Sequence, residues 1–333
     1  MRRPGRAVAP QLLQRLVFGL VALAFAGAAA QPGPAQEVTH PVAAGFRGDG
    51  SATYAASRPP ARWSLSPRKN LAWSAGLPCS GNASPVVASN LVITTCEPNV
   101  VVAVSLLDGA PVWERRVSVL DAMTHTERAS AETRLAESEA AARRLDVLQP
   151  RLAALKRDAR RSRSTTTDEL RRLLDEASAH QRLVERDRDL LTMPTGDLIG
   201  YASATPVTDG KAVFVTFANG LVAAFGLDGT PLWTRRFDRA TKPMNGYSSG
   251  HSASSLWADG TLVVPLGRLR GLDPSTGATR WESDEFLDFG TPTLIRTGGR
   301  VLVATASGGL YDAKTGGGAA RVPARIFYVG PVS

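Results

Sequence analysis

The 333-residue sequence lacks the motifs that would assign it a chemistry directly. Its four histidines, His40, His125, His180 and His251, do not have the spacing of metal ligands. It contains no P-loop, dinucleotide-binding fingerprint or nucleophile elbow. Aromatic residues make up only 6% of the chain and form no platform with the basic residues, so we expect no nucleic-acid partner despite a net charge of +9.

The apolar run near the N-terminus is too short to span a bilayer comfortably. It covers Leu16 to Ala26, follows a basic segment that contains Arg2 and Arg3, and precedes the small residues Ala28-Ala29-Ala30. This pattern is typical of a signal peptide. We therefore predict a signal peptide at residues 1–30, a Pro/Gly-rich lead-in at 31–69, no membrane span after cleavage, and a periplasmic or secreted protein.

Cysteine is also scarce, with only Cys79 and Cys96. An exported chain reaches an oxidising compartment, where a disulfide is permitted. A hairpin that turns at residues 88–90 would bring Cys96 near Asn82, a few residues from Cys79. We slightly favour a disulfide over the alternative of two buried, unpaired thiols.

In contrast, the sequence is rich in one internal repeat. Four segments share a small-residue start, hydrophobic strands and a turn of Asp-Gly or Thr-Gly type, which the first three follow with a tryptophan. Four short strands joined by tight turns predict one small antiparallel sheet per repeat, and such sheets must stack on neighbours to bury both faces. The fourth segment reaches Thr315-Gly316 without a tryptophan, and Leu71-Ala72-Trp73 suggests the tail of another repeat. We expect structural docking by Trp113, Trp233, Trp281, Gly109, Gly229 and Gly277.

The segments Ala103–Trp113, Ala224–Trp233 and Gly271–Trp281 resemble the tryptophan-docking motif of PQQ-type β-propellers. Phe46–Ser51 is similar to the lead-in of bacterial PQQ-like propellers. The resemblance covers roughly residues 70–118 and 198–317, and the family includes quinoprotein alcohol dehydrogenases and the propeller lipoprotein of outer-membrane protein assembly. It implies an all-β fold, a partial PQQ-type β-propeller of about four blades, with blades at 70–118 and at 194–333, the latter C-terminally incomplete.

Residues 119–193 interrupt the repeats with an Ala-, Leu-, Arg- and Glu-rich segment. Its apolar residues recur at heptad-like steps, which predicts an inserted α-helical coiled-coil hairpin. We expect a break at Pro150, a capping box at residues 166–169 and a second helix of about 25 residues. The apolar residues are Leu145, Leu148, Leu152, Leu155, Leu170, Leu174, Ala177, Val184 and Leu191.

Removing residues 121–191 makes the spacing from Trp113 to Trp233 similar to that from Trp233 to Trp281. The helices are therefore predicted to be an insertion between two blades, on the same face as the Gly/Ser-rich loop of residues 242–252. We take Asn245, Tyr247 and His251 in that loop as a candidate binding face.

The resemblance implies two possible functions. A PQQ-dependent dehydrogenase needs a carboxylate base, Ca²⁺ ligands and an aromatic floor under the quinone, and many such enzymes carry a vicinal disulfide. This sequence has no adjacent cysteines and no assignable Asp/Glu/Asn cluster for calcium. We therefore favour a non-catalytic binding or assembly scaffold of the cell envelope, with a protein partner and no cofactor, over a quinoprotein dehydrogenase that binds PQQ and Ca²⁺. The shortage of blades indicates a shortened member of a longer family or, less favoured, an oligomer in which a second chain completes the ring.

Overall fold

The computed structural model describes residues 45–48, 57–162, 168–188, 190–191, 199–238, 252–287 and 290–323. All of them belong to one compact unit, His40–Ser333. The predicted signal peptide, the capping box before the second helix, and Asn245, Tyr247 and His251 lie outside the described residues, apart from the last two positions of that capping box.

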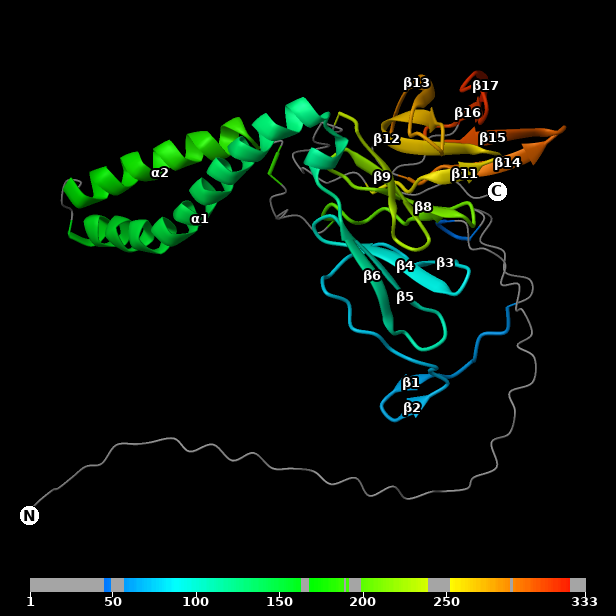
Figure 1. Ribbon diagram of the computed structural model, residues 1–333, viewed down its shortest axis with the longest axis horizontal. Coiled ribbons are helices and arrows are strands. Elements are labelled where there is room, and N and C mark those ends of the chain that lie inside the picture. The colour runs from blue at the N-terminus through cyan, green and yellow to red at the C-terminus, as the bar shows by residue number, and fades with distance from the viewer. Residues whose placement is uncertain are drawn as a thin grey trace, which may run out of the picture. The chain divides into compact units, whose positions relative to one another are not determined.

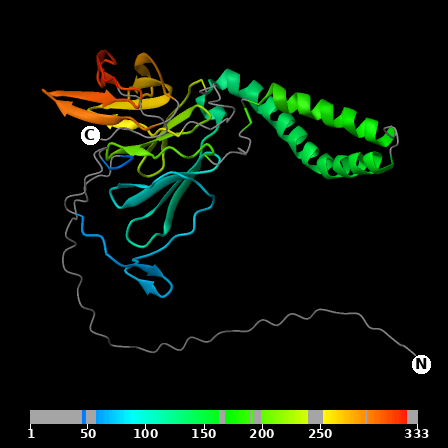
Figure 2. The same cartoon turned by 180° about the vertical axis from the view of Figure 1, so that it is seen from behind.

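Four antiparallel sheets follow one another along the chain, each made of strands adjacent in sequence (Figures 1 and 2). A short hairpin of β1 (Ser64–Leu65) and β2 (Arg68–Lys69) precedes them. The first sheet comprises β3 (Val86–Ala88), β4 (Leu91–Cys96), β5 (Val100–Ser105) and β6 (Pro111–Arg116). The second comprises β7 (Val207–Thr208), β8 (Ala212–Thr216), β9 (Leu221–Gly226) and β10 (Pro231–Arg236).

The third and fourth sheets complete the series. The third comprises β11 (Leu256–Ala258), β12 (Thr261–Leu272) and β13 (Thr279–Leu287). The fourth comprises β14 (Thr293–Thr297), β15 (Arg300–Ala304), β16 (Gly309–Asp312) and β17 (Gly318–Arg321). This arrangement confirms the predicted fold class of stacked propeller-type sheets with a helical insert.

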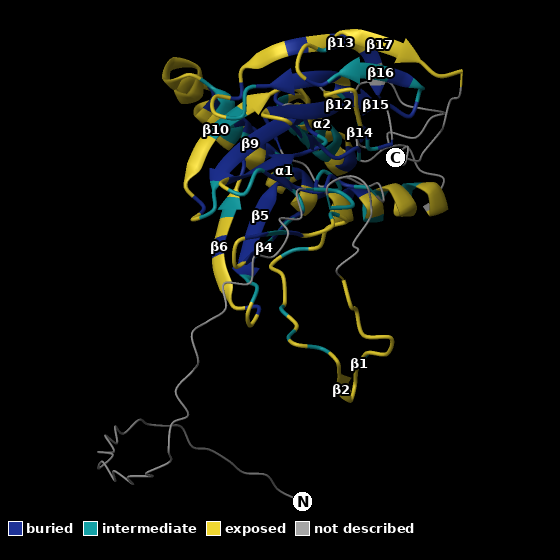
Figure 3. Ribbon diagram, turned by 90° about the vertical axis from the view of Figure 1, so that its right-hand side faces the viewer, coloured by how far each residue is buried: buried dark blue, intermediate teal, exposed yellow. Residues whose placement is uncertain are grey.

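In the second sheet the two middle strands are buried on both faces, whereas the outer strand is mostly exposed. Every residue of β8 is buried, as are the first five of β9, while most of β10 is exposed. Figure 3 shows the same contrast between β5 and β6. Strands buried on both faces must lie between other layers, and three apolar clusters fill the spaces between consecutive sheets. One joins the first and second sheets, the next joins the second and third, and the last joins the third and fourth.

In two repeats the number of strands differs from the number that the sequence predicts. The third was expected to have four strands, but β12 runs through the place where a turn separates β8 from β9, so its sheet has three. The second repeat has Asn219-Gly220 at that turn, and the third has no equivalent dipeptide. The fourth repeat was expected to be incomplete, yet it forms four strands. Only its tryptophan is missing, and Ala320 of β17 stands four residues after the turn glycine where the other repeats have the ring.

The insertion consists of a 3₁₀ turn, η1 (Val119–Ala122), and two antiparallel helices, α1 (His125–Ser162) and α2 (Asp168–Arg186) (Figure 1). The predicted apolar positions form the seam between the helices, where Leu148 and Leu152 of α1 pack against Leu170 of α2. The second helix has 19 residues rather than about 25, because the chain turns at Asp187. None of the described helices is long and apolar enough to cross a membrane.

The prediction of a break at Pro150 was wrong, because α1 continues as one helix through that residue. Proline removes one backbone hydrogen bond and crowds the preceding turn. Pro150 is exposed, so water can reach the carbonyl group that loses its partner. Leu148 and Leu152 on either side of it are buried in the seam. Packing of these leucines against α2 therefore holds the helix together across the proline.

Candidate functional site

Each tryptophan of the docking motif reaches over to the following repeat. Its indole N–H donates a hydrogen bond to a backbone carbonyl near the next glycine turn, and its ring covers that glycine. The donor–acceptor distances are 2.8 Å for Trp73 to Leu106 O, 2.8 Å for Trp113 to Leu227 O, 2.8 Å for Trp233 to Pro274 O and 3.1 Å for Trp281 to Ala313 O. The rings thus link consecutive repeats in one series, in which Trp73 docks on the first sheet.

The turn glycines serve both the turn and the ring above it. Gly229 has φ +81°, and a Cβ added there would lie 2.8 Å from the ring of Trp113. Gly316 has φ +71° and lies beneath Trp281 in the same way. The sequence pattern assigned these glycines to the turns, but it did not show that a ring from the preceding repeat rests on each. Trp73 and Gly316 thereby extend the predicted set of docking residues.

The aspartate of each turn holds the loop that carries the glycine. Asp228 Oδ1 accepts a hydrogen bond from the backbone N–H of Thr230 at 2.9 Å, and Asp108 accepts one from Ala110 at 3.1 Å. The hydrogen bonds from Thr230 keep the pKa of Asp228 below its usual value. The glycine supplies the positive φ and the aspartate supplies an acceptor for a free N–H, which is the division of roles that such turns require.

An arginine two residues after the tryptophan strengthens two of these contacts. Arg115 Nε donates to the carbonyl of Gly229 at 2.8 Å, and Arg235 Nη2 donates to that of Thr276 at 2.9 Å. The third repeat has Ser283 at this position. The spacing Trp-x-Arg in the first two repeats was the available signal, and the sequence reading missed it.

Hydroxyl groups at the small-residue starts link neighbouring sheets at their inner strands. The backbone N–H of Thr205 donates to Ser254 Oγ at 2.9 Å, and that of Ser254 donates to Thr291 Oγ1 at 2.9 Å. Thr216 and Ser255 share a further bond of 2.7 Å. Because these side chains are small, the inner strands of neighbouring sheets can lie close together. Because they are polar, they also provide hydrogen-bond partners for the buried backbone N–H groups of Thr205 and Ser254.

The dehydrogenase resemblance implies a quinone that is held together with Ca²⁺. Ca²⁺ takes six to eight oxygen ligands, among which carboxylates are prominent. In the described part of the chain no three His, Cys, Asp or Glu side chains gather as potential ligands. The hydroxyl groups of Ser254 and Thr291 already accept backbone N–H groups, and that of Ser255 bonds the hydroxyl of Thr216.

Cys79 and Cys96 form a disulfide, with their Cα atoms 5.6 Å apart. Cys96 ends β4 and is fully buried, and it packs in a small apolar cluster with Trp73 and Val100. The bridge attaches the segment that carries Trp73 to the first sheet. It therefore reinforces the first docking contact of the series.

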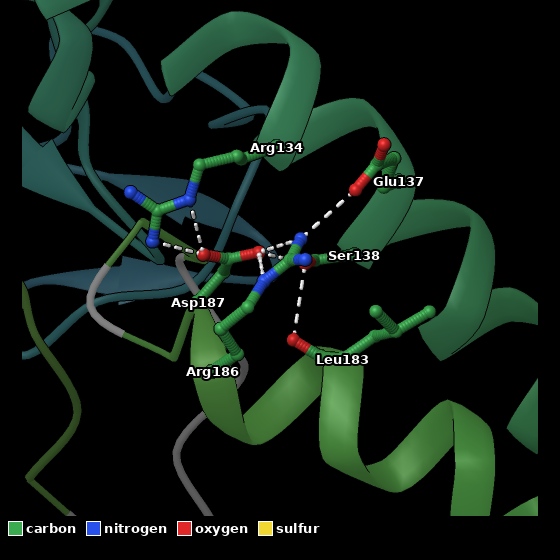
Figure 4. Close-up of polar contacts among 6 residues, drawn as sticks. All are labelled: Arg134, Glu137, Ser138, Leu183, Arg186 and Asp187. Carbon is green, nitrogen blue, oxygen red and sulfur yellow. Dashed lines mark hydrogen bonds and ion pairs between the residues drawn. The ribbon is translucent and has the colours of Figure 1, made fainter. Parts of the chain in front are cut away.

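The base of the helical hairpin is held by a buried carboxylate (Figure 4). Asp187 has a fully buried side chain and accepts hydrogen bonds from Arg134 Nε at 2.8 Å, Arg186 Nη2 at 2.6 Å and Ser138 Oγ at 2.6 Å. Burial alone would raise the pKa of Asp187, but the bonds from Arg186, Ser138 and Arg134 together lower it to about 2. The carboxylate thus joins the end of α2 to the first third of α1.

Apolar residues next to this cluster fix the hairpin to the sheets. Ala131 of α1 and Leu190 after α2 are buried in the same cluster as Ile93 of the first sheet and Phe217, which follows β8 of the second. At the entry to the hairpin, Ser118 and Asp121 cap η1 reciprocally, which satisfies backbone N–H groups at its start. We call this region, residues 118–138 and 183–191, the hairpin base.

A second buried carboxylate lies at the outer edge of the third and fourth sheets. Glu285 accepts hydrogen bonds from Tyr311 Oη at 2.5 Å, Arg321 Nη2 at 2.8 Å and Thr305 Oγ1 at 3.3 Å. Burial and the bond to Glu285 raise the pKa of Tyr311 to about 12. Glu285 and Tyr311 both line a depression of about 390 Å³ at the surface. Because its oxygens are occupied by three donors, this carboxylate fastens β13 to the fourth sheet.

Comparisons with known proteins locate the repeats. Residues 195–327 match the family model described as outer membrane protein assembly factor BamB. Among curated proteins, none matches the chain in sequence.

Solved structures with similar folds have low identity to this chain. BamB from Moraxella catarrhalis is 12% identical, with a TM-score of 0.40, and the match covers 77% of this chain and 54% of that one. The quinohemoprotein alcohol dehydrogenase ADHIIG from Pseudomonas putida HK5 is 14% identical, with a TM-score of 0.39, and the match covers 76% and 35%. The chain therefore spans about half or less of the length of these structures.

The assignment of the repeats depends on the family match and on the internal pattern. The matched residues include the second, third and fourth sheets, with Trp233 docked on Gly277 and Trp281 on Gly316. The first sheet has the same order of strands and the same docked tryptophan. Residues 195–327, which hold the second, third and fourth sheets, are therefore similar to the family described as outer membrane protein assembly factor BamB, and the first sheet has the same pattern.

Proposed function

We propose that this protein is a non-catalytic scaffold of the cell envelope, periplasmic or secreted, that binds a protein partner through its helical hairpin. The observation that carries the proposal is the way the hairpin is attached. Trp113 docks on Gly229 directly across the insertion. The docking of Trp113 on the second sheet is therefore made without any residue of α1 or α2, and only the hairpin base packs into the core between the two sheets.

The firm attachment of the hairpin supports a binding role. Asp187 is buried among three donors at the hairpin base, and Ala131 and Leu190 enter the core between two sheets. An element held at one end by a rigid scaffold presents its remaining surface in a defined orientation, which favours recognition. Val147, with 67% of its surface exposed, is the large apolar side chain that the hairpin offers to a partner.

Two further observations support the envelope location. The disulfide Cys79–Cys96 is of a kind that persists in oxidising compartments. The matching family model is named for the assembly of outer membrane proteins. A partner among the proteins of that process is the specific form of the proposal.

The test is site-specific photo-crosslinking in the cells that produce the protein. A photoreactive residue at Val147 should capture a partner, and the same residue at Leu107, an equally accessible site 85% exposed on the first repeat, should not. A variant in which a short Gly/Ser linker replaces residues 139–182 keeps the hairpin base, because Ser138 and Leu183 are hydrogen-bonded neighbours, and it should stay folded and lose the partner. Recovery of the same proteins from the Leu107 site or from the linker variant would exclude the hairpin as the binding element.

A separate reconstitution experiment tests the proposal that the protein is non-catalytic. Addition of PQQ and Ca²⁺ should produce no stoichiometric quinone absorbance and no dye-linked oxidation of alcohols or sugars. If both signals appear, the protein is a quinoprotein dehydrogenase and the scaffold proposal is replaced.

A further inference from the structure

The end of the hairpin away from its base carries an excess of basic side chains. We call this region, residues 151–161 of α1 and 168–172 of α2, the hairpin tip. It contains seven basic residues and three acidic ones, namely Arg151, Lys156, Arg157, Arg160, Arg161, Arg171 and Arg172 against Asp158, Asp168 and Glu169. The rest of the two helices has six basic and eight acidic residues. Positive charge is therefore concentrated at one end of the hairpin.

Most of these charges lack a carboxylate partner. Arg151 pairs with Glu169 at 2.7 Å, and Arg171 pairs with Asp168 at 3.0 Å. Within the described residues no ion pair involves Lys156, Arg157, Arg160, Arg161 or Arg172, and all five are exposed. In the rest of the two helices, five of the six basic residues pair with acidic side chains, and only Arg182 among these described residues does not. The five are Arg128, Arg134, Arg143, Arg144 and Arg186.

Helix stability explains only some of this pattern. Arg160 and Arg161 lie in the last turn of α1, where positive charge compensates the partial negative charge of the helix C-terminus. Lys156 and Arg157 lie before that turn. Arg172 is the fifth residue of α2 and lies far from its C-terminus, so the helix dipole does not favour a positive charge there. Three unpaired cations thus remain for which the helices themselves give no reason.

We propose that the hairpin tip binds the surface of a membrane that contains anionic phospholipids. The five unpaired cations lie on the exposed surfaces of two helices, which suits a plane of phosphate groups better than a single small anion. No large apolar side chain of the described tip residues is exposed, so the contact is electrostatic and at the headgroups, without insertion. Basic side chains near such a surface each strengthen binding by about five-fold.

The probe is the mature protein mixed with vesicles of equal parts phosphatidylglycerol and phosphatidylcholine. We expect co-sedimentation that is lost with pure phosphatidylcholine and that weakens as the ionic strength rises, because salt screens exposed charges. The variant Arg157→Gln/Arg160→Gln/Arg161→Gln should bind about 100-fold more weakly. Lys156→Gln/Arg172→Gln, which spares the end of α1, should bind about 25-fold more weakly.

The matched control removes three arginines from the other part of the hairpin, as Arg143→Gln/Arg182→Gln/Arg188→Gln. It has the same net charge as the triple tip variant and should bind the vesicles almost as the unchanged protein does. Circular dichroism verifies the helices of every variant. Equal losses in the tip and control variants would overturn the proposal, as would binding to soluble polyglutamate without binding to the vesicles, which would indicate an acidic protein instead.

Discussion

The repeats and the hairpin are stabilised by different interactions. Between consecutive sheets, apolar side chains such as Val213, Leu221 and Val263 are completely buried, and an indole ring closes each contact. In the hairpin a narrow seam of leucines is flanked by ion pairs, and among its described residues the fully buried charge is Asp187 at the base. The comparison indicates that the repeats owe their stability to burial and fit, and the hairpin owes a larger share of its stability to charge.

The largest effect is expected where a docked ring is removed. Trp113→Ala empties a buried space between the first two sheets, removes the bond to Leu227 O, and should lower the free energy of unfolding by about 3–5 kcal/mol. Denaturant unfolding measures it. Trp63→Ala is the matched control, because Trp63 is 65% exposed and its loss should change stability little. A similar effect of both substitutions would contradict the docking role.

The disulfide should contribute somewhat less. Cys79 and Cys96 are 17 residues apart, and a loop of this length restricts the unfolded chain by about 3 kcal/mol. Cys79→Ser/Cys96→Ser should destabilise the first repeat by about that amount and leave the hairpin unaffected, which hydrogen exchange resolves by segment. Faster exchange in α1 and α2 would show that the two regions are not independent.

At the hairpin base the effect should depend on charge. Asp187→Asn breaks a buried ion pair, but Arg134 and Arg186 remain partly exposed and can be hydrated, so we expect about 2 kcal/mol rather than the full cost of a buried charge. Hydrogen exchange at the start of α1 and the end of α2 should rise. Asp175→Asn, at an exposed site of α2, is the control.

The same carboxylate predicts a dependence on pH. Because the pKa of Asp187 is about 2 in the folded protein and near 3.8 when the chain is unfolded, its contribution is present above pH 4 and is lost as the pH falls towards 2. An acid titration of helical circular dichroism should show this loss, and Asp187→Asn should remove it. An unchanged acid transition in the variant would exclude Asp187 as its source.

The smallest effect on stability is expected for an exposed arginine–carboxylate ion pair, in contrast to the buried one at Asp187. Arg151 and Glu169 are 2.7 Å apart, with 61% and 49% of their side chains exposed. Arg151→Ala should cost less than about 0.5 kcal/mol, because water and ions screen such pairs. If thermal unfolding shows a loss equal to that of Asp187→Asn, burial is not what distinguishes the two pairs.

Sequence reasoning was most successful where a pattern is local. The Asp-Gly and Thr-Gly turns, the tryptophans four residues beyond, and the leucine steps of the hairpin all predicted the elements that form. It failed at Pro150, where contacts of Leu148 and Leu152 with another helix outweigh a local breaker. It also failed in the third repeat, where the absence of a turn dipeptide joins two expected strands into β12.

By itself the sequence determined that this protein is a series of small sheets with helices inserted between two of them, because strand alternation, turn chemistry and helical period are properties of neighbouring residues. Only the tertiary structure decided which ring covers which glycine and where the hairpin is attached. Trp113 and Gly229 are 116 positions apart, and Arg134 and Asp187 are 53 apart. Contacts between residues so far apart in the sequence depend on how the helices and strands pack together, and a local sequence pattern does not predict that packing.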